Sequence, residues 1–121
     1  MAAVVSGEVI ILTSLHELEI VTAMQLKVFR GEAQPEQAVA AARLVRDDVA
    51  AGKLLEVEVD WQVVWRASAR LAQNHAAATG CRSLDILHCA LAKAVLATRF
   101  VSSDKRQIAL ARAEALPVLA I

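Results

Sequence analysis

The stretch RSLDILHCALAKAVLATRFVSSD, residues 82–104, decides the fold. Its first part is the most apolar segment with a helical pattern, and Asp85 stands in the first turn of that helix. Residues 99–104 follow as a short strand whose C-terminal end carries a second carboxylate, Asp104. In an alternating fold, helix N-termini and strand C-termini lie on one edge of the sheet, where ligands usually bind. The sequence therefore predicts that Asp85 and Asp104 face each other.

The patterns on either side of this stretch predict four more helices and two more strands. The short apolar run at residues 9–12 is expected to be a buried strand, residues 54–59 an extended stretch or a connector, and residues 118–121 a closing strand. The helices are expected at residues 14 to about 30, 35 to about 51, 61 to about 78 and 107–115. This order predicts an α/β fold with a small parallel sheet flanked by helices, in one domain that spans residues 1–121.

Local signals place the ends of these helices. Ser14 and Glu17 match the S-x-x-E capping box, Pro35 suits a first helical turn, and Asp60 is expected to cap the third helix, which Gly80 ends. These residues mark boundaries and carry no chemistry of their own.

Composition and charge narrow the classes of function. The chain has 13 basic and 13 acidic residues, so it has no general attraction to nucleic acid, and any polyanion site has to be local. No run approaches the roughly 18 apolar residues of a membrane span, which predicts no membrane partner and a cytoplasmic location. Cys81 and Cys89 lack zinc-site spacing and are expected to be buried, reduced thiols.

A third carboxylate, Glu19, stands out on the first predicted helix. On a helical wheel it falls within an apolar arc formed by Leu15, Leu18, Thr22, Ala23, Leu26 and Phe29. Burying an unpaired acid costs several kcal/mol, so a compensating group is expected. The N-terminal turns of this helix follow the strand at residues 9–12, which predicts that Glu19 reaches the same sheet edge as Asp85 and Asp104.

Three neighbouring carboxylates repel one another unless a cation lies between them. Oxygen-only ligation suits Mg²⁺ or Mn²⁺, and the associated chemistry is phosphodiester hydrolysis. The cations that flank the acids are candidates for holding phosphates: Arg82, Lys105 and Arg106. Each acid also has a purely structural alternative, which is a helix dipole for Asp85, a helix cap for Asp104 and an arginine partner for Glu19.

Residues 82–90 followed by residues 100–107 resemble the C-terminal half of a PIN domain of the VapC toxin type. Residues 18–24 are similar to the glutamate-bearing helix of that family. The resemblance implies a metal-dependent endoribonuclease with Glu19, Asp85 and Asp104 as metal-site acids and with the hydroxyl of Ser102 supporting them. It also implies an RNA substrate, neutralisation by a small VapB-type antitoxin, and a homodimer.

Members of that family open with a central strand that ends in an aspartate, the first metal ligand, and this chain starts after it. We therefore expect either a start upstream of Met1 or a shortened remnant. The alternative function is a non-catalytic PIN-like remnant that binds an antitoxin or oligomerises. A phosphatase with an aspartyl nucleophile is disfavoured, because the sequence has neither a D-x-D motif nor a Gly-rich phosphate loop.

Overall fold

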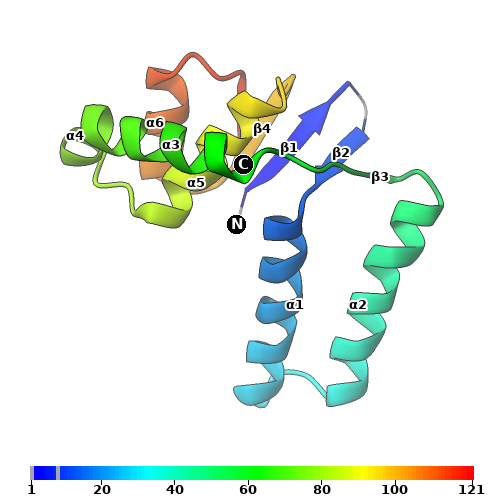
Figure 1. Ribbon diagram of the computed structural model, residues 1–121. Coiled ribbons are helices and arrows are strands. Elements are labelled where there is room, and N and C mark those ends of the chain that lie inside the picture. The colour runs from blue at the N-terminus through cyan, green and yellow to red at the C-terminus, as the bar shows by residue number, and fades with distance from the viewer. Residues whose placement is uncertain (1, 8) are drawn as a thin grey trace. The chain divides into compact units, whose positions relative to one another are not determined.

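The computed structural model describes residues 2–7 and 9–121 and divides the chain into two compact units. The smaller unit comprises residues 9–58, and the larger unit comprises residues 2–7 and 59–121. Both units combine strands with helices, so the α/β class predicted from the sequence is observed in each (Figure 1). That residues 1–121 form one domain stays a prediction.

The smaller unit is a helical hairpin between two parallel strands. Strand β2 pairs in parallel with strand β3, with Ile11 opposite Leu55. The chain crosses between them through helices α1 and α2, which lie side by side in Figure 1. The bounds are β2 Val9–Leu12, α1 Ser14–Phe29, α2 Pro35–Ala50 and β3 Leu54–Glu56. The predicted strand and both predicted helices are confirmed, and the undecided segment at residues 54–59 is a strand over its first half.

The first helix begins as predicted, but its cap is one residue earlier than the sequence indicated. Thr13 is the N-cap, and Nδ1 of His16 accepts a hydrogen bond from the backbone N–H of Thr13 at 3.1 Å. Glu17, the expected capping partner, instead pairs with Arg46 of α2 at 2.7 Å. Arg46 also pairs with Glu56 of β3 at 2.6 Å, so one guanidinium links three elements of this unit.

The apolar arc predicted around Glu19 is buried only in part, because Leu15 and Ala23 are half-buried and its other members are exposed. The side chains of Leu18 and Phe29 are 63% and 86% exposed, Leu26 is also exposed, and Glu19 itself is half-buried. Helix α1 has a second apolar side, because Ile20, Val21, Met24 and Val28 are half-buried at helical spacing. A helix that is apolar on two sides can bury only one of them fully against a single neighbour, so the side that carries Glu19 is the more exposed of the two.

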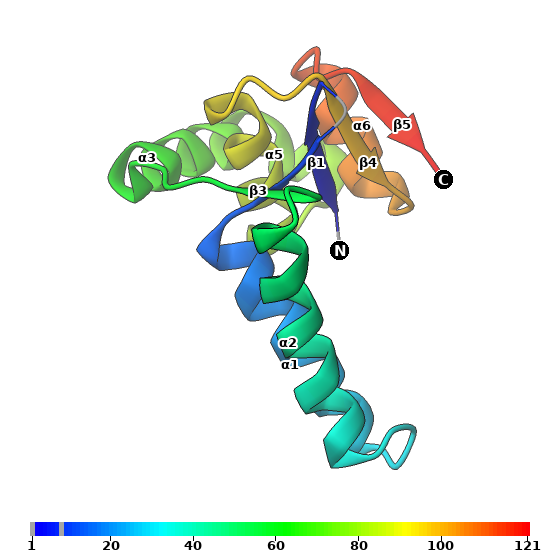
Figure 2. The same cartoon turned by 90° about the vertical axis from the view of Figure 1, so that its right-hand side faces the viewer.

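The larger unit contains a mixed sheet of three strands. Strand β4 (Arg99–Ser102) lies between β1 (Ala3–Ser6), which is antiparallel to it, and β5 (Val118–Ala120), which is parallel (Figure 2). The prediction of a simply parallel sheet is therefore wrong. The strand at residues 3–6 was not predicted from the sequence.

The helices of the larger unit pack in succession on this sheet. Helix α6 contacts β4 and β5, α5 contacts α6, and α3 contacts α5. Their bounds are α3 Trp61–Leu71, α4 Ala77–Thr79, α5 Ser83–Ala94 and α6 Lys105–Ala113, with a π-helical turn η1, Ala72–Ala76, between α3 and α4. Among the helices in residues 2–7 and 9–121, none is long and apolar enough to cross a membrane.

The predicted ends of the third helix are confirmed. The side chain of Asp60 accepts hydrogen bonds from the backbone N–H groups of Gln62 and Val63, at 3.1 and 3.3 Å. Gly80 ends the helical run at φ 72°, a left-handed conformation that favours glycine.

The core of the larger unit forms around α5 and β4. Residues 86–92 of α5 are all buried, as expected for a helix packed on most of its circumference. Phe100 of β4 and Leu91 of α5 are fully buried. Cys81 and Cys89 are buried and free, as predicted, and burial raises the pKa of Cys89 to about 12.

Candidate metal centre

Asp85 and Asp104 line one hollow of the larger unit. The hollow has a volume of about 410 Å³, and its lining residues are Arg82, Ser83, Leu84, Asp85, Asp104 and Arg106. Asp85 lies in the first turn of α5, and Asp104 is the N-cap of α6, two residues after the end of β4. The end of a strand and the starts of two helices thus bring together acids that are 19 positions apart in the sequence.

Each aspartate uses one carboxylate oxygen to begin a helix. Oδ2 of Asp85 accepts a hydrogen bond from the backbone N–H of Arg82 at 3.1 Å. Oδ1 of Asp104 accepts one from the backbone N–H of Gln107 at 2.9 Å. Within residues 2–7 and 9–121, the other oxygen of each carboxylate makes no hydrogen bond. Asp85 therefore lies in a first helical turn and Asp104 caps a helix, as their structural alternatives predicted. One oxygen of each carboxylate remains available to a ligand.

Ser102 supports the backbone of Asp104 rather than its carboxylate. The side chain is 1% exposed, and its Oγ accepts a hydrogen bond from the backbone N–H of Asp104 at 3.1 Å. The same hydroxyl donates to Oε1 of Gln107 at 2.6 Å. Ser102 thus fixes the direction in which the chain leaves β4, and with it the position of Asp104.

Gln107 is a residue of this site that the sequence analysis missed. It is 3% exposed, and its Nε2 donates to the backbone oxygen of Asp85 at 3.3 Å. The pattern D-x-x-Q from Asp104 to Gln107, a capping-box spacing, could have drawn attention to it. That spacing does not reveal that the amide reaches α5.

Two of the three predicted phosphate-binding cations line the hollow. Arg82 and Arg106 lie in its wall, whereas Lys105 is an exposed residue at the start of α6 and is not a lining residue. The hollow therefore combines two carboxylates with two guanidinium groups. Such a mixture suits a cation that is shared between protein acids and a phosphate.

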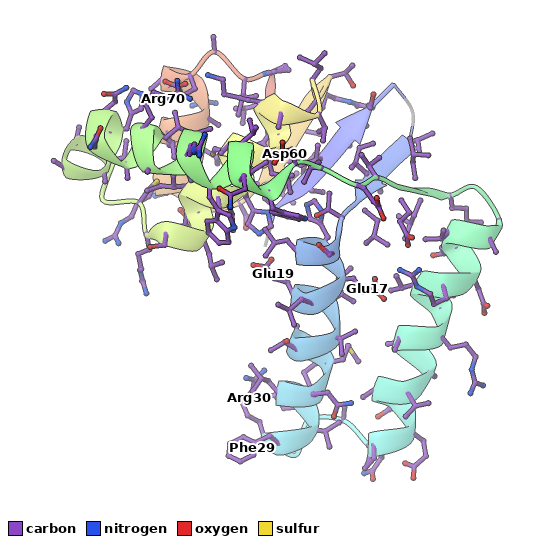
Figure 3. The ribbon with its side chains drawn as sticks, viewed as in Figure 1. Glu17, Glu19, Phe29, Arg30, Asp60 and Arg70 are labelled. Carbon is purple, nitrogen blue, oxygen red and sulfur yellow. The ribbon has the colours of Figure 1, made fainter. Side chains whose placement is uncertain are left out.

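Glu19 belongs to the smaller unit, in the second turn of α1 (Figure 3). Its predicted place beside the two aspartates stays a prediction. Among residues 2–7 and 9–121, no group of three or more histidine, cysteine, aspartate or glutamate side chains is arranged to hold a metal ion. The pair of aspartates still fits Mg²⁺ or Mn²⁺, because hard cations are commonly bound through one or two carboxylates plus water and substrate phosphate.

The thiol of Cys81 lies beside this pair and is not available as a ligand. Its pKa is raised, mainly by burial and further by the negative charges of Asp85 and Asp104. The Sγ donates to the backbone oxygen of Arg106 at 3.1 Å. A neutral thiol that already donates a hydrogen bond binds a hard cation poorly, so the oxygen-only character of the site is preserved.

A second hollow, of about 420 Å³ between α3 and α5, suits a metal less well. Its lining is mostly apolar, and Glu114 is the only carboxylate among its lining residues in the described part of the chain. Glu114 is already paired with Lys93 and His75, which lower its pKa. The hollow that holds Asp85 and Asp104 is therefore the better candidate for a metal centre.

Comparison with known proteins assigns no family and no function to this site. No family model, no curated protein and no solved structure matches the chain. The resemblance to PIN domains rests on the motifs at residues 18–24, 82–90 and 100–107.

Proposed function

We propose that this chain is a Mg²⁺- or Mn²⁺-dependent endoribonuclease of the VapC toxin type, with a PIN-like fold. The observation that carries the proposal is the shared hollow of Asp85 and Asp104, in which each acid keeps one oxygen without a hydrogen bond to the described residues. Two carboxylates at the ends of a strand and a helix are the arrangement that the motif resemblance implies. Glu19 is proposed as the third acid on the sequence pattern alone.

The residues of the hollow have different proposed roles in phosphodiester hydrolysis. Asp85 and Asp104 would hold the cation through their remaining oxygens, and Arg82 and Arg106 would bind the phosphate of the RNA backbone. A bound Mg²⁺ or Mn²⁺ lowers the pKa of water and stabilises the leaving oxygen. Ser102 keeps Asp104 in place through its backbone N–H.

The same resemblance supports the proposed partners. They are an RNA substrate, a VapB-type antitoxin and a second copy of the chain, in the cytoplasm. No membrane partner is proposed.

Titration with Mn²⁺ followed by calorimetry tests the metal site directly. The wild-type chain is expected to bind Mn²⁺ saturably, and Asp85→Asn is expected to weaken that binding by more than about tenfold, since a neutral amide replaces a ligand oxygen. Asn retains an oxygen that can accept from the N–H of Arg82, so the start of α5 is preserved. Wild-type heats no larger than those of dilution, or equal binding by the variant, would reject the site.

The non-catalytic alternative is favoured by one observation, the exposed apolar side of α1. Leu18, Leu26 and Phe29 present large apolar surfaces along one side of this helix, and contiguous apolar patches mark interaction sites. We propose on this basis that α1 is the surface through which such a remnant oligomerises. The labelled Phe29 lies at the end of α1 farthest from Glu19 (Figure 3).

Light scattering after gel filtration tests this alternative. The wild-type chain is expected to elute with the mass of a dimer, and the double variant Leu26→Ser, Phe29→Ser is expected to shift to monomer, because the apolar area that drives association is lost. Lys27→Ser, at an exposed position on the opposite side of α1 from Leu18, serves as the control and should leave the mass unchanged. A monomeric wild-type chain at the highest concentration tested would contradict this role.

A further inference from the structure

We infer that Gln107 is a positioning residue that sets the separation of Asp85 and Asp104, and that metal affinity depends on its side-chain amide. The inference rests on the proposed function and adds a residue to it. Gln107 is not a lining residue of the hollow, and its side-chain amide acts through the hydroxyl of Ser102 and the backbone oxygen of Asp85.

Three hydrogen bonds carry the inference, and each reaches a different element. The backbone N–H of Gln107 holds Oδ1 of Asp104, at the start of α6. Its Oε1 accepts from Oγ of Ser102, at the end of β4. Its Nε2 donates to the backbone oxygen of Asp85, in the first turn of α5. Only the last of these bonds connects α5 to the segment that carries Asp104.

Because Gln107 is buried, breaking its hydrogen bonds costs free energy that water cannot restore. At 3% exposure, its amide cannot exchange these partners for bulk water, and an unsatisfied buried polar group costs about 1–3 kcal/mol. The donor and acceptor ends are both engaged, so the side chain has one favoured orientation. The distance between the two acids is therefore set by a rigid side chain.

Replacing the side-chain amide of Gln107 with an apolar group of similar size tests its positioning role while the cap of α6 is kept. In Gln107→Met the backbone N–H still caps α6 through Asp104, and Oγ of Ser102 still accepts from the N–H of Asp104. Methionine has a similar length and fills the same space without polar atoms. The substitution removes the two hydrogen bonds of the amide, to Ser102 of β4 and to Asp85 of α5.

The experiment compares Mn²⁺ affinity in wild type, Gln107→Met and Ser68→Ala, with thermal unfolding measured in parallel. Ser68 is a matched buried polar residue of α3, whose Oγ donates to the backbone oxygen of Val64 outside the hollow. Gln107→Met is expected to lose about 10- to 100-fold in Mn²⁺ affinity, the usual cost of removing a group that orients metal ligands. Ser68→Ala is expected to retain wild-type affinity with little change in thermal stability, because its hydroxyl only back-bonds within α3 and alanine favours a helix. Equal affinity in wild type and Gln107→Met, or an equal loss in Ser68→Ala, would overturn the inference.

A second measurement keeps the inference separate from the proposed function. In crystals without metal, the Cγ–Cγ separation of Asp85 and Asp104 is expected to change by more than about 0.5 Å between wild type and Gln107→Met, a tolerance typical of preorganised sites. An unchanged separation would overturn the role of Gln107. If the separation differs between the two chains and the wild-type chain binds no Mn²⁺, the metal site is rejected and the positioning role is retained. If Gln107→Met does not fold, Gln107→Asn, which keeps an uncharged amide but is one methylene shorter and so loses the reach to Asp85, takes its place in both measurements.

Discussion

Replacing Asp104 with asparagine is expected to reduce Mn²⁺-dependent cleavage of single-stranded RNA by more than about 100-fold. The variant keeps an oxygen that can accept from the N–H of Gln107, and asparagine caps helices as well as aspartate does, so α6 should form normally. What is lost is the negative charge of the carboxylate that lines the hollow together with Asp85. The measurement is the initial rate of cleavage at a saturating concentration of Mn²⁺.

Asp60→Asn is the matched control for this experiment. Asp60 also caps a helix of the larger unit, accepting from two backbone N–H groups, but it does not line the hollow. Its variant should cleave RNA at the wild-type rate. Full activity in Asp104→Asn would reject the proposed role of Asp104, and an equal loss in both variants would assign the effect to helix capping.

The largest expected effect on stability is that of Phe100→Ala, at about 3–5 kcal/mol of unfolding free energy. Phe100 is fully buried in the middle strand of the three-stranded sheet, opposite Val4 of β1 and Val118 of β5. Truncation to alanine removes the apolar contacts of the ring and leaves a cavity that a close-packed sheet cannot collapse around. Urea denaturation followed by circular dichroism measures the change.

The chain contains one other phenylalanine, Phe29, which provides a control of the same chemistry. Phe29 is 86% exposed at the end of α1, so at a concentration at which the chain is monomeric Phe29→Ala should change the unfolding free energy by less than about 0.5 kcal/mol. A large loss in Phe29→Ala measured under dimerising conditions would place this side chain in an interface. A small loss in Phe100→Ala would show that β4 is not the core strand described above.

The candidate site was partly accessible from the sequence. Asp85 and Asp104 follow from local patterns, because an acid in a first helical turn and an acid at a strand end have definite positions relative to a sheet edge. Gln107 does not follow from such a pattern, because its partners Ser102 and Asp85 belong to β4 and α5, and only their packing against α6 brings them within reach. For Glu19, the sequence predicts its position on helix α1. It does not predict what surrounds that helix, because this depends on contacts between residues far apart in the chain.

Taken alone, the sequence determined several helix boundaries of this protein, although α1 is capped one residue earlier and α6 begins two residues earlier than predicted. Pro35, Asp60 and Gly80 act on the backbone within a few residues of themselves, so the resulting boundaries need no knowledge of the rest of the chain. Only the tertiary structure decided that β1 runs antiparallel to β4 and which apolar side of α1 is buried. Strand direction and burial depend on hydrogen bonds and contacts between residues far apart in the chain, and these are formed only when the elements pack.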